Sequence, residues 1–274
     1  MAIHIKEKLS KGDVITGVVT FSPCVEMVQT IAHAGFDFIM IDQMYGSITW
    51  EHAANMARAA RLSGITPIVR LQAEPWAVKD NQQLAVDTGK ALSVGFQGIN
   101  FSVSSADEVR RVVDVALGHG GWHRELQVIP WTRETFPQYL EQIREDTFIG
   151  VSVEGQSALD EIEEIAAVPG LDSISCSTTD LSITLGHGVV SDNPDTWALF
   201  DKLRDIADKN GLVLRSNTGM GYSTFPEMKS RAKDLIERGA RMIVFQHSEL
   251  LLQMAGKYVL EDLPVGRRPE LQTA

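Results

Sequence analysis

Two carboxylates and an arginine stand at positions where a buried strand would give way to a loop. Glu154 follows the apolar run IGVSV, Asp180 comes shortly after SISCS, and Arg70 closes TPIVR. Carboxylate oxygens are the ligands that Mg²⁺ and Mn²⁺ prefer, whereas Zn²⁺ would require histidine or thiolate ligands, which these positions supply sparingly. An arginine beside such a cation suits an anionic substrate or a developing enolate. The pattern therefore indicates a site for a hard divalent cation and an anion.

Each of these residues also has a structural interpretation. A strand-end carboxylate often caps the next helix, which applies to Asp180 and to Asp42 at the end of FIMID. Arg70 could equally pair with a core carboxylate. Glu154 lies between VSV and a glycine, a poor position for a merely solvated acid, so we favour a functional role there. For Asp42 we expect a structural role, in which it fixes the turn that follows and holds Arg70.

An alternation of short β-type runs with helix-like segments indicates the fold that would bring these positions together. The candidate strands are residues 13–21, 37–42, 66–71, 98–103, 126–131, 148–154, 172–177, 212–216 and 241–247. Such alternation implies βαβ units and a parallel sheet. Because no linker divides the chain, we predict one closed (β/α)₈ TIM barrel domain over residues 1–274 rather than an open doubly wound sheet. The reactive face of such a barrel lies at the carboxyl ends of its strands.

Nine candidate strands are one too many for this barrel, and we exclude 126–131. This run carries a proline, which a central strand tolerates poorly. Two helices are expected to begin at serine caps, Ser105 and Ser157, and to close on glycine. Arg215 and His247 end two of the other strands, and we expect both to be structural.

The composition excludes several classes of protein. The net charge of −11 argues against a nucleic-acid partner, although a local arginine or a metal can still create a site for a small anion. No apolar run is long enough for a membrane span, and the charged N-terminus lacks a signal-peptide centre. Cys24 and Cys176 are too few for a disulfide framework, so we expect a reduced, cytoplasmic protein. No glycine-rich nucleotide motif follows the first strand.

Four segments, in the order AGFDFIMID, PIVRL, VSVEGQSALDEI and TTDLSITLG, carry a family resemblance. The chain resembles the HpcH/HpaI aldolase family, which includes 2-dehydro-3-deoxyglucarate aldolase, over nearly its whole length. The resemblance implies a class II pyruvate aldolase built on a TIM barrel, with a small-molecule 2-oxoacid substrate. It also implies a divalent metal (Mg²⁺ or Mn²⁺, with Co²⁺ as a further option) and a homohexamer with helices exchanged between paired subunits.

The resemblance assigns roles residue by residue. Glu154 and Asp180 match the metal-binding carboxylates of the family. Arg70 matches the arginine that contacts the keto oxygen of pyruvate and its enolate. The pyruvate carboxylate would be held by the backbone amides of a short loop formed by Ser177, Thr178 and Thr179.

The chain departs from the family at the acid/base position. Where the family has Ile-Asp-x-Glu-His, this sequence has Met44 and Tyr45 in place of the glutamate and the histidine. The aspartate that orients this histidine lies in a Leu-Asp-x-Gly stretch, where this chain has Ser93. The two losses agree, because the aspartate has little purpose without the imidazole. A glutamine two residues before Glu154 is replaced by Ser152.

Three interpretations follow. A carbon–carbon lyase would cleave a 4-hydroxy-2-oxoacid and would use Tyr45, or water at the metal site, for proton transfer. A phenol with a reference pKa near 10 is a poor base at neutral pH unless its surroundings lower that value. A synthase would instead use the enolate for condensation, and a non-catalytic homologue would only bind a 2-oxoacid. Five large apolar or aromatic residues are expected near the mouth, and their number favours a substrate more apolar or aromatic than a sugar acid: Met44, Tyr45, Trp76, Trp122 and Trp131.

Overall fold

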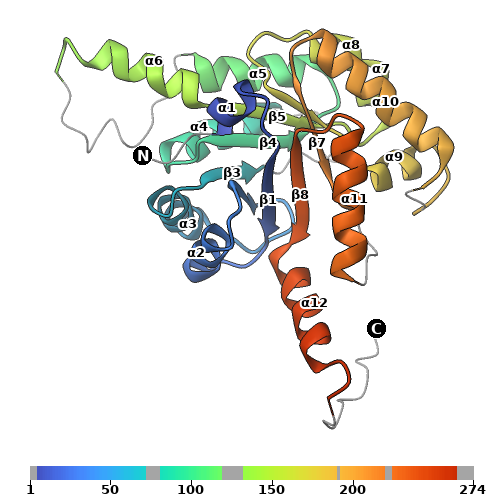
Figure 1. Ribbon diagram of the computed structural model, residues 1–274. Helices are drawn as coiled ribbons and strands as arrows, with labels where there is room; N and C mark the ends of the chain where they lie inside the picture. The colour runs from blue at the N-terminus through green and yellow to red at the C-terminus, as the bar shows by residue number, and fades with distance from the viewer. Residues whose placement is uncertain (1–4, 72–80, 119–131, 190–191, 220–223, 264–274) are drawn as a thin grey trace.

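A closed barrel of parallel strands forms the centre of the protein (Figure 1). The computed structural model describes residues 5–71, 81–118, 132–189, 192–219 and 224–263. Within these residues eight strands pair in sequence order, from β1 round to β8 and back to β1. They are β1 (Ile15–Thr20), β2 (Phe38–Asp42), β3 (Thr66–Arg70), β4 (Gly98–Ser102), β5 (Phe148–Ser152), β6 (Ser173–Ser175), β7 (Val213–Asn217) and β8 (Met242–His247). The predicted (β/α)₈ barrel is confirmed; the excluded run 126–131 lies outside the described residues.

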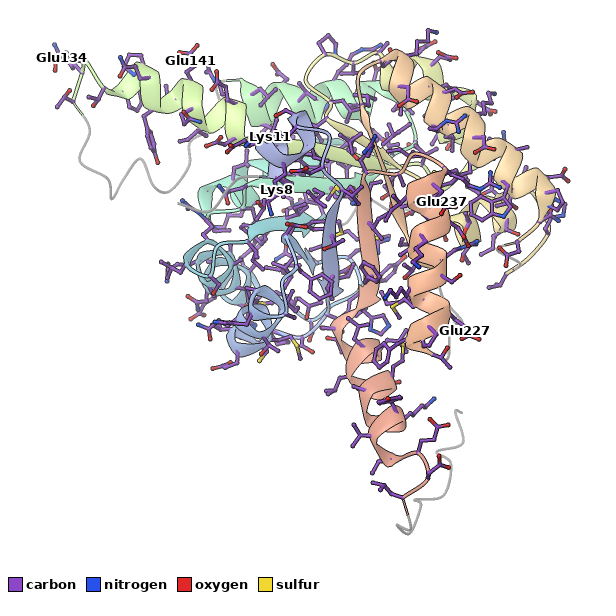
Figure 2. The ribbon with its side chains drawn as sticks, viewed as in Figure 1. Lys8, Lys11, Glu134, Glu141, Glu227 and Glu237 are labelled. Atoms are coloured by element: carbon purple, nitrogen blue, oxygen red, sulfur yellow. The ribbon has the colours of Figure 1, made fainter. Side chains whose placement is uncertain are left out.

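Helices alternate with these strands and surround the barrel. They are α1 (Ile5–Ser10), α2 (Val25–His33), α3 (Trp50–Leu62), α4 (Asn81–Ser93), α5 (Ala106–Leu117), α6 (Phe136–Asp146), α7 (Gln156–Asp160), α8 (Ile162–Ala166), α9 (Thr178–Thr184), α10 (Pro194–Lys209), α11 (Phe225–Glu237) and α12 (Ser248–Leu260). Figure 2 shows Glu141 on α6 and Glu237 on α11 at the outer surface. None of the described helices is long and apolar enough to cross a membrane.

One of the two predicted serine caps is confirmed and the other is wrong. The Ser105 side chain accepts a hydrogen bond from the backbone N–H of Glu108 and begins α5. Ser157 instead lies inside α7, whose N-cap is Gly155, and the helical segment breaks at Glu161. At this break Glu161 Oε2 accepts a hydrogen bond from the N–H of Ala106, the first residue of α5, at 3.0 Å.

The two ends of the barrel interior differ in polarity. An apolar cluster that includes Phe38, Ile68 and Phe148 packs inside with Ile5 of α1. A Cβ at Gly17 would lie 2.3 Å from the Phe38 ring, so glycine is required for this ring to fit. Toward the carboxyl ends of the strands the buried residues become polar: Asn100, Ser102, Ser152, Ser175 and Arg215. The apolar cluster thus fills one end of the barrel interior. The polar side chains gather at the carboxyl ends of the strands, where TIM-barrel enzymes have their active sites.

Candidate active site

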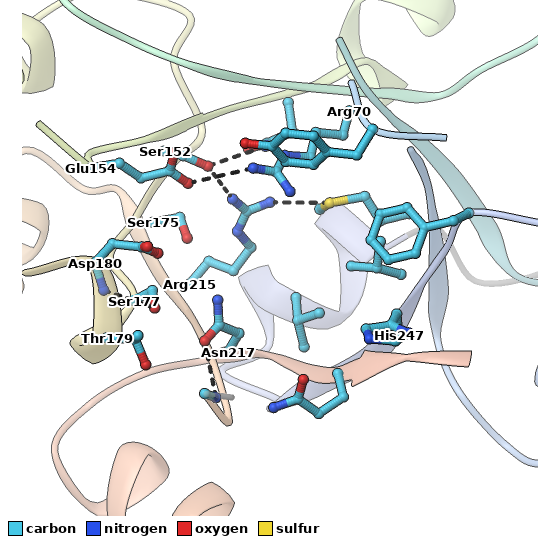
Figure 3. A pocket seen from close by; sticks show the side chains of 18 residues that line it. Arg70, Ser152, Glu154, Ser175, Ser177, Thr179, Asp180, Arg215, Asn217 and His247 are labelled. Atoms are coloured by element: carbon cyan, nitrogen blue, oxygen red, sulfur yellow. Dashed lines mark hydrogen bonds and ion pairs between the residues drawn. The ribbon is translucent and has the colours of Figure 1, made fainter. Parts of the chain in front are cut away.

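A cavity of about 510 Å³ opens at the carboxyl ends of the strands (Figure 3). Its walls include the predicted catalytic and metal residues Tyr45, Arg70, Glu154 and Asp180, which lie at the end of, or shortly after, four different strands. Two residues of the predicted carboxylate loop, Ser177 and Thr179, also line it. The structure thus brings together, in one cavity, residues that are far apart in the sequence. Trp76, Trp122 and Trp131 lie outside the described residues.

Asp42 organises the entrance to this cavity. Its side chain is fully buried, and Oδ1 accepts hydrogen bonds from the backbone N–H groups of Met44 at 2.9 Å and Tyr45 at 2.7 Å. Oδ2 accepts a hydrogen bond from Nη1 of Arg70 at 3.3 Å. One carboxylate therefore fixes the turn and holds the arginine, which confirms the structural role expected for Asp42.

Arg70 lies between this anchor and the first of the two site carboxylates. Its Nη2 is 3.8 Å from Oε1 of Glu154, while Oε2 of Glu154 accepts a hydrogen bond from Ser102 Oγ at 2.8 Å. The guanidinium carbon lies 5.2 Å from the centre of the Tyr45 ring, in cation–π range. Asp42, Glu154 and Tyr45 thus fix the position of the Arg70 guanidinium, which also lines the cavity.

Asp180 and Glu154 form a pair of neighbouring carboxylates. Burial raises the pKa of Asp180, and the negative charge of Glu154 raises it further, against smaller opposing effects of Ser177 and Arg70. Among the described residues no lysine or arginine forms an ion pair with Asp180. Two like charges in a partly buried site are stabilised by a cation, so this pair fits a divalent metal. No described group joins three or more acidic, histidine or cysteine ligands, so water and substrate would complete the metal shell.

The segment that carries Asp180 is tied firmly to the segment that carries Glu154. Ser177 caps α9 by accepting a hydrogen bond from the N–H of Asp180 at 3.4 Å. At the other end of α9, Thr184 Oγ1 donates to the backbone carbonyl of Glu154 at 2.7 Å. Thr178 does not line the cavity; its buried hydroxyl accepts a hydrogen bond from Arg231 Nη2 at 3.0 Å. The predicted loop 177–179 is thus the N-cap and first turn of α9, and contacts at Thr178 and Thr184 hold it in place.

Tyr45 occupies the rim of the cavity, and its side chain is 60% exposed. Burial of the remainder raises the pKa of its hydroxyl above the ordinary phenol value, and the nearby Arg70 cation offsets this only in part. The phenol therefore stays protonated at neutral pH. It can donate a hydrogen bond to a substrate oxygen, but it is not a base in this arrangement.

Two residues with expected structural roles, Arg215 and His247, also line the cavity. His247 ends β8, and an irregularity in the β1–β8 pairing sets Val19 opposite it. The preceding Gln246 has φ of 39°, a conformation rare for residues other than glycine. A bulge of this kind re-aims the next side chain, and a Gln-His pair at a strand end does not reveal it in the sequence.

The His247 ring has two competing partners at Nδ1. The N–H of Leu250 lies 3.2 Å from Nδ1, and Oε2 of Glu249 lies 3.3 Å from it. Glu249 is itself held by hydrogen bonds from the N–H of Phe21 and the hydroxyl of Ser22. Pairing with Glu249 places the ring proton on Nδ1 and leaves Nε2 as an acceptor, whereas capping α12 through Leu250 requires the opposite tautomer.

An eight-stranded barrel with carboxylates and arginines gathered in a cavity at its carboxyl end has the architecture of a TIM-barrel enzyme. Comparison with known proteins narrows this class. A sequence profile of the HpcH/HpaI aldolase/citrate lyase family matches residues 19–244, and the chain belongs to this family. It is accordingly an enzyme of the carbon–carbon lyase class.

Relatives with assigned activities are similar over most of the chain. A hydroxypyruvate/pyruvate aldolase of Paraburkholderia phytofirmans is 26% identical over 76% of this chain and 80% of its own length. A 2-keto-3-deoxy-L-rhamnonate aldolase of Escherichia coli O157:H7 is 26% identical over 72% of each chain. The crystal structure of an HpcH/HpaI aldolase from Desulfitobacterium hafniense superposes with a TM-score of 0.81 at 24% identity, covering 98% of this chain and all of the other.

Proposed function

We propose that the protein is a metal-dependent carbon–carbon lyase that acts through a pyruvate-type enolate and cleaves a 4-hydroxy-2-oxoacid. The observation that carries this proposal is the convergence of Arg70, Glu154 and Asp180 on one cavity in a member of an aldolase family. Two relatives are named as aldolases, one of hydroxypyruvate or pyruvate and one of 2-keto-3-deoxy-L-rhamnonate, and these names support the proposal.

Glu154 and Asp180 would hold the divalent cation, for which we propose Mg²⁺ or Mn²⁺, with Co²⁺ as a substitute. Both ligands are hard carboxylate oxygens, and no described histidine or thiolate joins them. When bound, such a cation polarises a keto group and stabilises the negative charge that develops on its oxygen.

Different residues of the cavity would bind different groups of the substrate. Arg70 would donate to the keto oxygen, and its fork is already oriented by Asp42. The N–H groups of Ser177, Thr178 and Thr179, at the start of α9, would donate hydrogen bonds to the carboxylate, and Arg231 holds this segment through Thr178. Tyr45, protonated at the rim, would donate to an oxygen of the departing carbonyl fragment. The interaction of Arg70 strengthens as negative charge develops on the keto oxygen, which is the requirement for rate enhancement.

Cleavage also requires a group that takes the proton of the substrate's 4-hydroxyl. Tyr45 is unsuited to this step because its pKa is raised. His247 is the one histidine among the described residues of the cavity wall, and pairing with Glu249 would leave its Nε2 free to accept a proton. General acid–base help is worth about 10²–10⁴-fold, so a chain without the family's histidine should be a slow aldolase if His247 does not substitute for it.

The altered position 45 also supports a second candidate function. A synthase that condenses an enolate with a carbonyl partner has no alcohol to deprotonate, so it does not need a base at this position. A non-catalytic 2-oxoacid binder is disfavoured, because Arg70, Glu154 and Asp180 are all retained in contact with the cavity.

Two measurements on the purified protein test these alternatives. Exchange of the pyruvate methyl protons with D₂O, followed by NMR with and without Mg²⁺ or Mn²⁺, reports enolate formation. Exchange that depends on metal is expected, and its absence would leave only the non-catalytic interpretation. A screen for pyruvate release from 4-hydroxy-2-oxoacids then separates the lyase from the synthase, since only the lyase releases pyruvate efficiently.

We also propose that the protein is a homo-oligomer, for which the family resemblance implies a hexamer. In Figure 1 helix α12 extends beyond β8 and away from the barrel. It carries apolar side chains that are between 53% and 70% exposed: Leu252, Tyr258, Val259 and Leu260. An apolar helix of this kind is stabilised by packing against a second copy. Light scattering should show an oligomer that a Leu252→Lys, Val259→Lys variant dissociates.

A further inference from the structure

The side of the cavity formed by β8, β1 and β2 carries aromatic side chains. These three strands are neighbours in the barrel; Phe21 follows β1, Tyr45 follows β2 and His247 ends β8. All three residues line the cavity and together form an aromatic wall. The centres of the Phe21 and His247 rings lie 5.1 Å apart, and the ring planes are tilted by 56°. Val19 of β1 adds an aliphatic side chain to the same side of the cavity.

The loops that carry the aromatic wall are fixed by contacts within the protein. The N–H of Phe21 donates a hydrogen bond to Oε1 of Glu249 at 3.2 Å, which ties the end of β1 to the start of α12. Gly46 packs against the same loop, because a Cβ at this position would lie 2.6 Å from the carbonyl oxygen of Asp42 and 3.2 Å from that of Phe21. Glycine therefore lets the segments that carry Phe21 and Tyr45 pack closely together.

The two metal-site carboxylates lie across the barrel from the aromatic wall. Glu154 follows β5, which stands opposite β1 in a barrel whose eight strands are in sequence order, and Asp180 follows β6. Figure 3 shows His247 on the far side of the cavity from Glu154 and Asp180. A 2-oxoacid bound at these carboxylates would therefore extend its other end toward the aromatic wall. The cavity volume of about 510 Å³ is in the range that holds ligands much larger than pyruvate.

The aromatic wall favours an apolar group at this end of the substrate. Phe21 and Val19 are only partly buried, so a ligand that covers them removes apolar surface from water. Neither side chain offers a hydrogen-bond partner, so the hydroxyl groups of a sugar chain would lie against them unsatisfied. An aromatic ring gains additional stabilisation from edge-to-face or offset packing with other rings.

We propose that the aromatic wall binds an aromatic ring at C4 of the substrate, so that the enzyme cleaves a 4-aryl-4-hydroxy-2-oxoacid to pyruvate and an aromatic aldehyde. The inference rests on the proposed function, in which Arg70 and the metal site hold the 2-oxoacid end and Tyr45 donates to an oxygen of the departing fragment. The C3–C4 bond breaks, and its electron pair remains on C3 as the enolate. The C4 hydroxyl passes its proton to a base in the cavity and becomes the aldehyde oxygen. Return of a proton to C3 gives pyruvate.

Ligands that lack the 4-hydroxyl, and therefore cannot be cleaved, provide the test. Pyruvate, 2-oxohexanoate and 2-oxo-4-phenylbutanoate share the 2-oxoacid end, and the last two extend it by a flexible alkyl chain and by an aromatic ring. Their Kd values for the full-length, Mn²⁺-loaded protein are measured by titration calorimetry. We expect the phenyl compound to bind at least about tenfold more tightly than pyruvate, since burial of an aromatic ring is worth about tenfold to a hundredfold, and more tightly than 2-oxohexanoate. A phenyl compound that binds no better than either of the other two overturns the proposal.

Variants assign the preference to Phe21. Phe21→Ala should reduce the ratio of the Kd values for pyruvate and the phenyl compound to within about threefold. Phe225→Ala serves as the matched control and should keep the wild-type ratio, because Phe225 is a partly exposed residue of α11 that packs against Tyr258 and does not line the cavity. A wild-type ratio in folded Phe21→Ala overturns the assignment. If that variant does not fold, Phe21→Leu replaces it, and an unchanged preference for the phenyl compound over 2-oxohexanoate overturns the assignment instead.

The same titrations separate this inference from the proposed function. If pyruvate and the two larger 2-oxoacids bind with equal Kd values, the 2-oxoacid site stands and the role of the aromatic wall fails. If none of the three binds in the presence of Mn²⁺, the 2-oxoacid site itself is wrong, and the inference falls with it.

Discussion

Replacement of Asp42 by asparagine should weaken the fold and the site together. The buried Asp42 carboxylate accepts hydrogen bonds from the N–H groups of Met44 and Tyr45 through Oδ1 and from Arg70 through Oδ2. Asparagine keeps the shape, and its carbonyl oxygen can still accept from the two backbone groups. Its NH₂ group would then face the Arg70 guanidinium, donor against donor. The turn survives, but Arg70 loses its anchor.

The contacts of Arg70 determine how much stability the Asp42→Asn variant should lose. Removal of one partner from a buried ion pair costs about 3–5 kcal/mol. The Arg70 side chain is 19% exposed and keeps Glu154 at 3.8 Å, so part of its charge remains compensated. We expect the free energy of unfolding to fall by about 2–3 kcal/mol, equivalent to roughly 5–10 °C in Tm for a protein of this size. A displaced arginine should also lower kcat, by roughly tenfold to a hundredfold.

An exposed aspartate–arginine pair supplies the control for this experiment. Oδ1 of Asp107 lies 2.5 Å from Nη1 of Arg110, and the two side chains are 78% and 55% exposed. Ion pairs as exposed as this one contribute little to stability. Thermal unfolding followed by circular dichroism should show no resolvable change for Asp107→Asn. If Asp42→Asn behaves like this control in both Tm and kcat, the anchoring role of Asp42 is refuted.

Three further predictions concern the cavity. Chelation should abolish activity and Mg²⁺, Mn²⁺ or Co²⁺ should restore it; full activity of a metal-free Glu154→Gln, Asp180→Asn variant would contradict the metal assignment. Arg70→Lys should lower kcat far more than it raises KM, because lysine lacks the planar fork, and pyruvate proton exchange that is intact in Arg70→Ala would show the role to be wrong. Tyr45→Phe should lower kcat by about a hundredfold if the hydroxyl takes part in proton transfer or donation; a change below about threefold would make Tyr45 a wall of the pocket.

The sequence predicts the barrel and its polar end well, because both depend on local patterns. Eight apolar runs separated by helical segments correspond to β1–β8, and strand-end residues meet wherever parallel strands close into a barrel. The role of Asp42 in fixing the turn is also local, since it accepts hydrogen bonds from the N–H groups two and three residues ahead. These features follow from neighbours along the chain.

The remaining features depend on contacts between distant segments. The helical segment breaks at Glu161, whose side chain accepts a hydrogen bond from the start of α5, a contact across 55 residues of sequence. His247 faces the cavity because of an irregular pairing of β8 with β1, the first strand of the chain. Arg215 spans the barrel to reach Met40 on β2 and Ser152 on β5, and no pattern around RSN in the sequence indicates these contacts. Side-chain direction inside a closed barrel is a property of the whole fold.

Ser93 allows a test of whether a neighbouring subunit contributes to the active site. Ser93 ends α4, which leads into the start of β4, so it lies at the amino end of the barrel, opposite the cavity. Within one chain an aspartate at position 93 cannot orient a histidine at position 45, and only a neighbouring copy could bring them together. In an oligomer, Tyr45→His with Ser93→Asp should therefore release pyruvate from 4-hydroxy-2-oxoacids at least about tenfold faster than Tyr45→His alone, because an oriented imidazole is the better base. Adding the α12 changes Leu252→Lys and Val259→Lys should remove this difference if they dissociate the assembly. A double variant that equals the single one while still oligomeric would mean that the subunits do not share this site, and a gain that persists in a monomer would contradict the geometry described for α4.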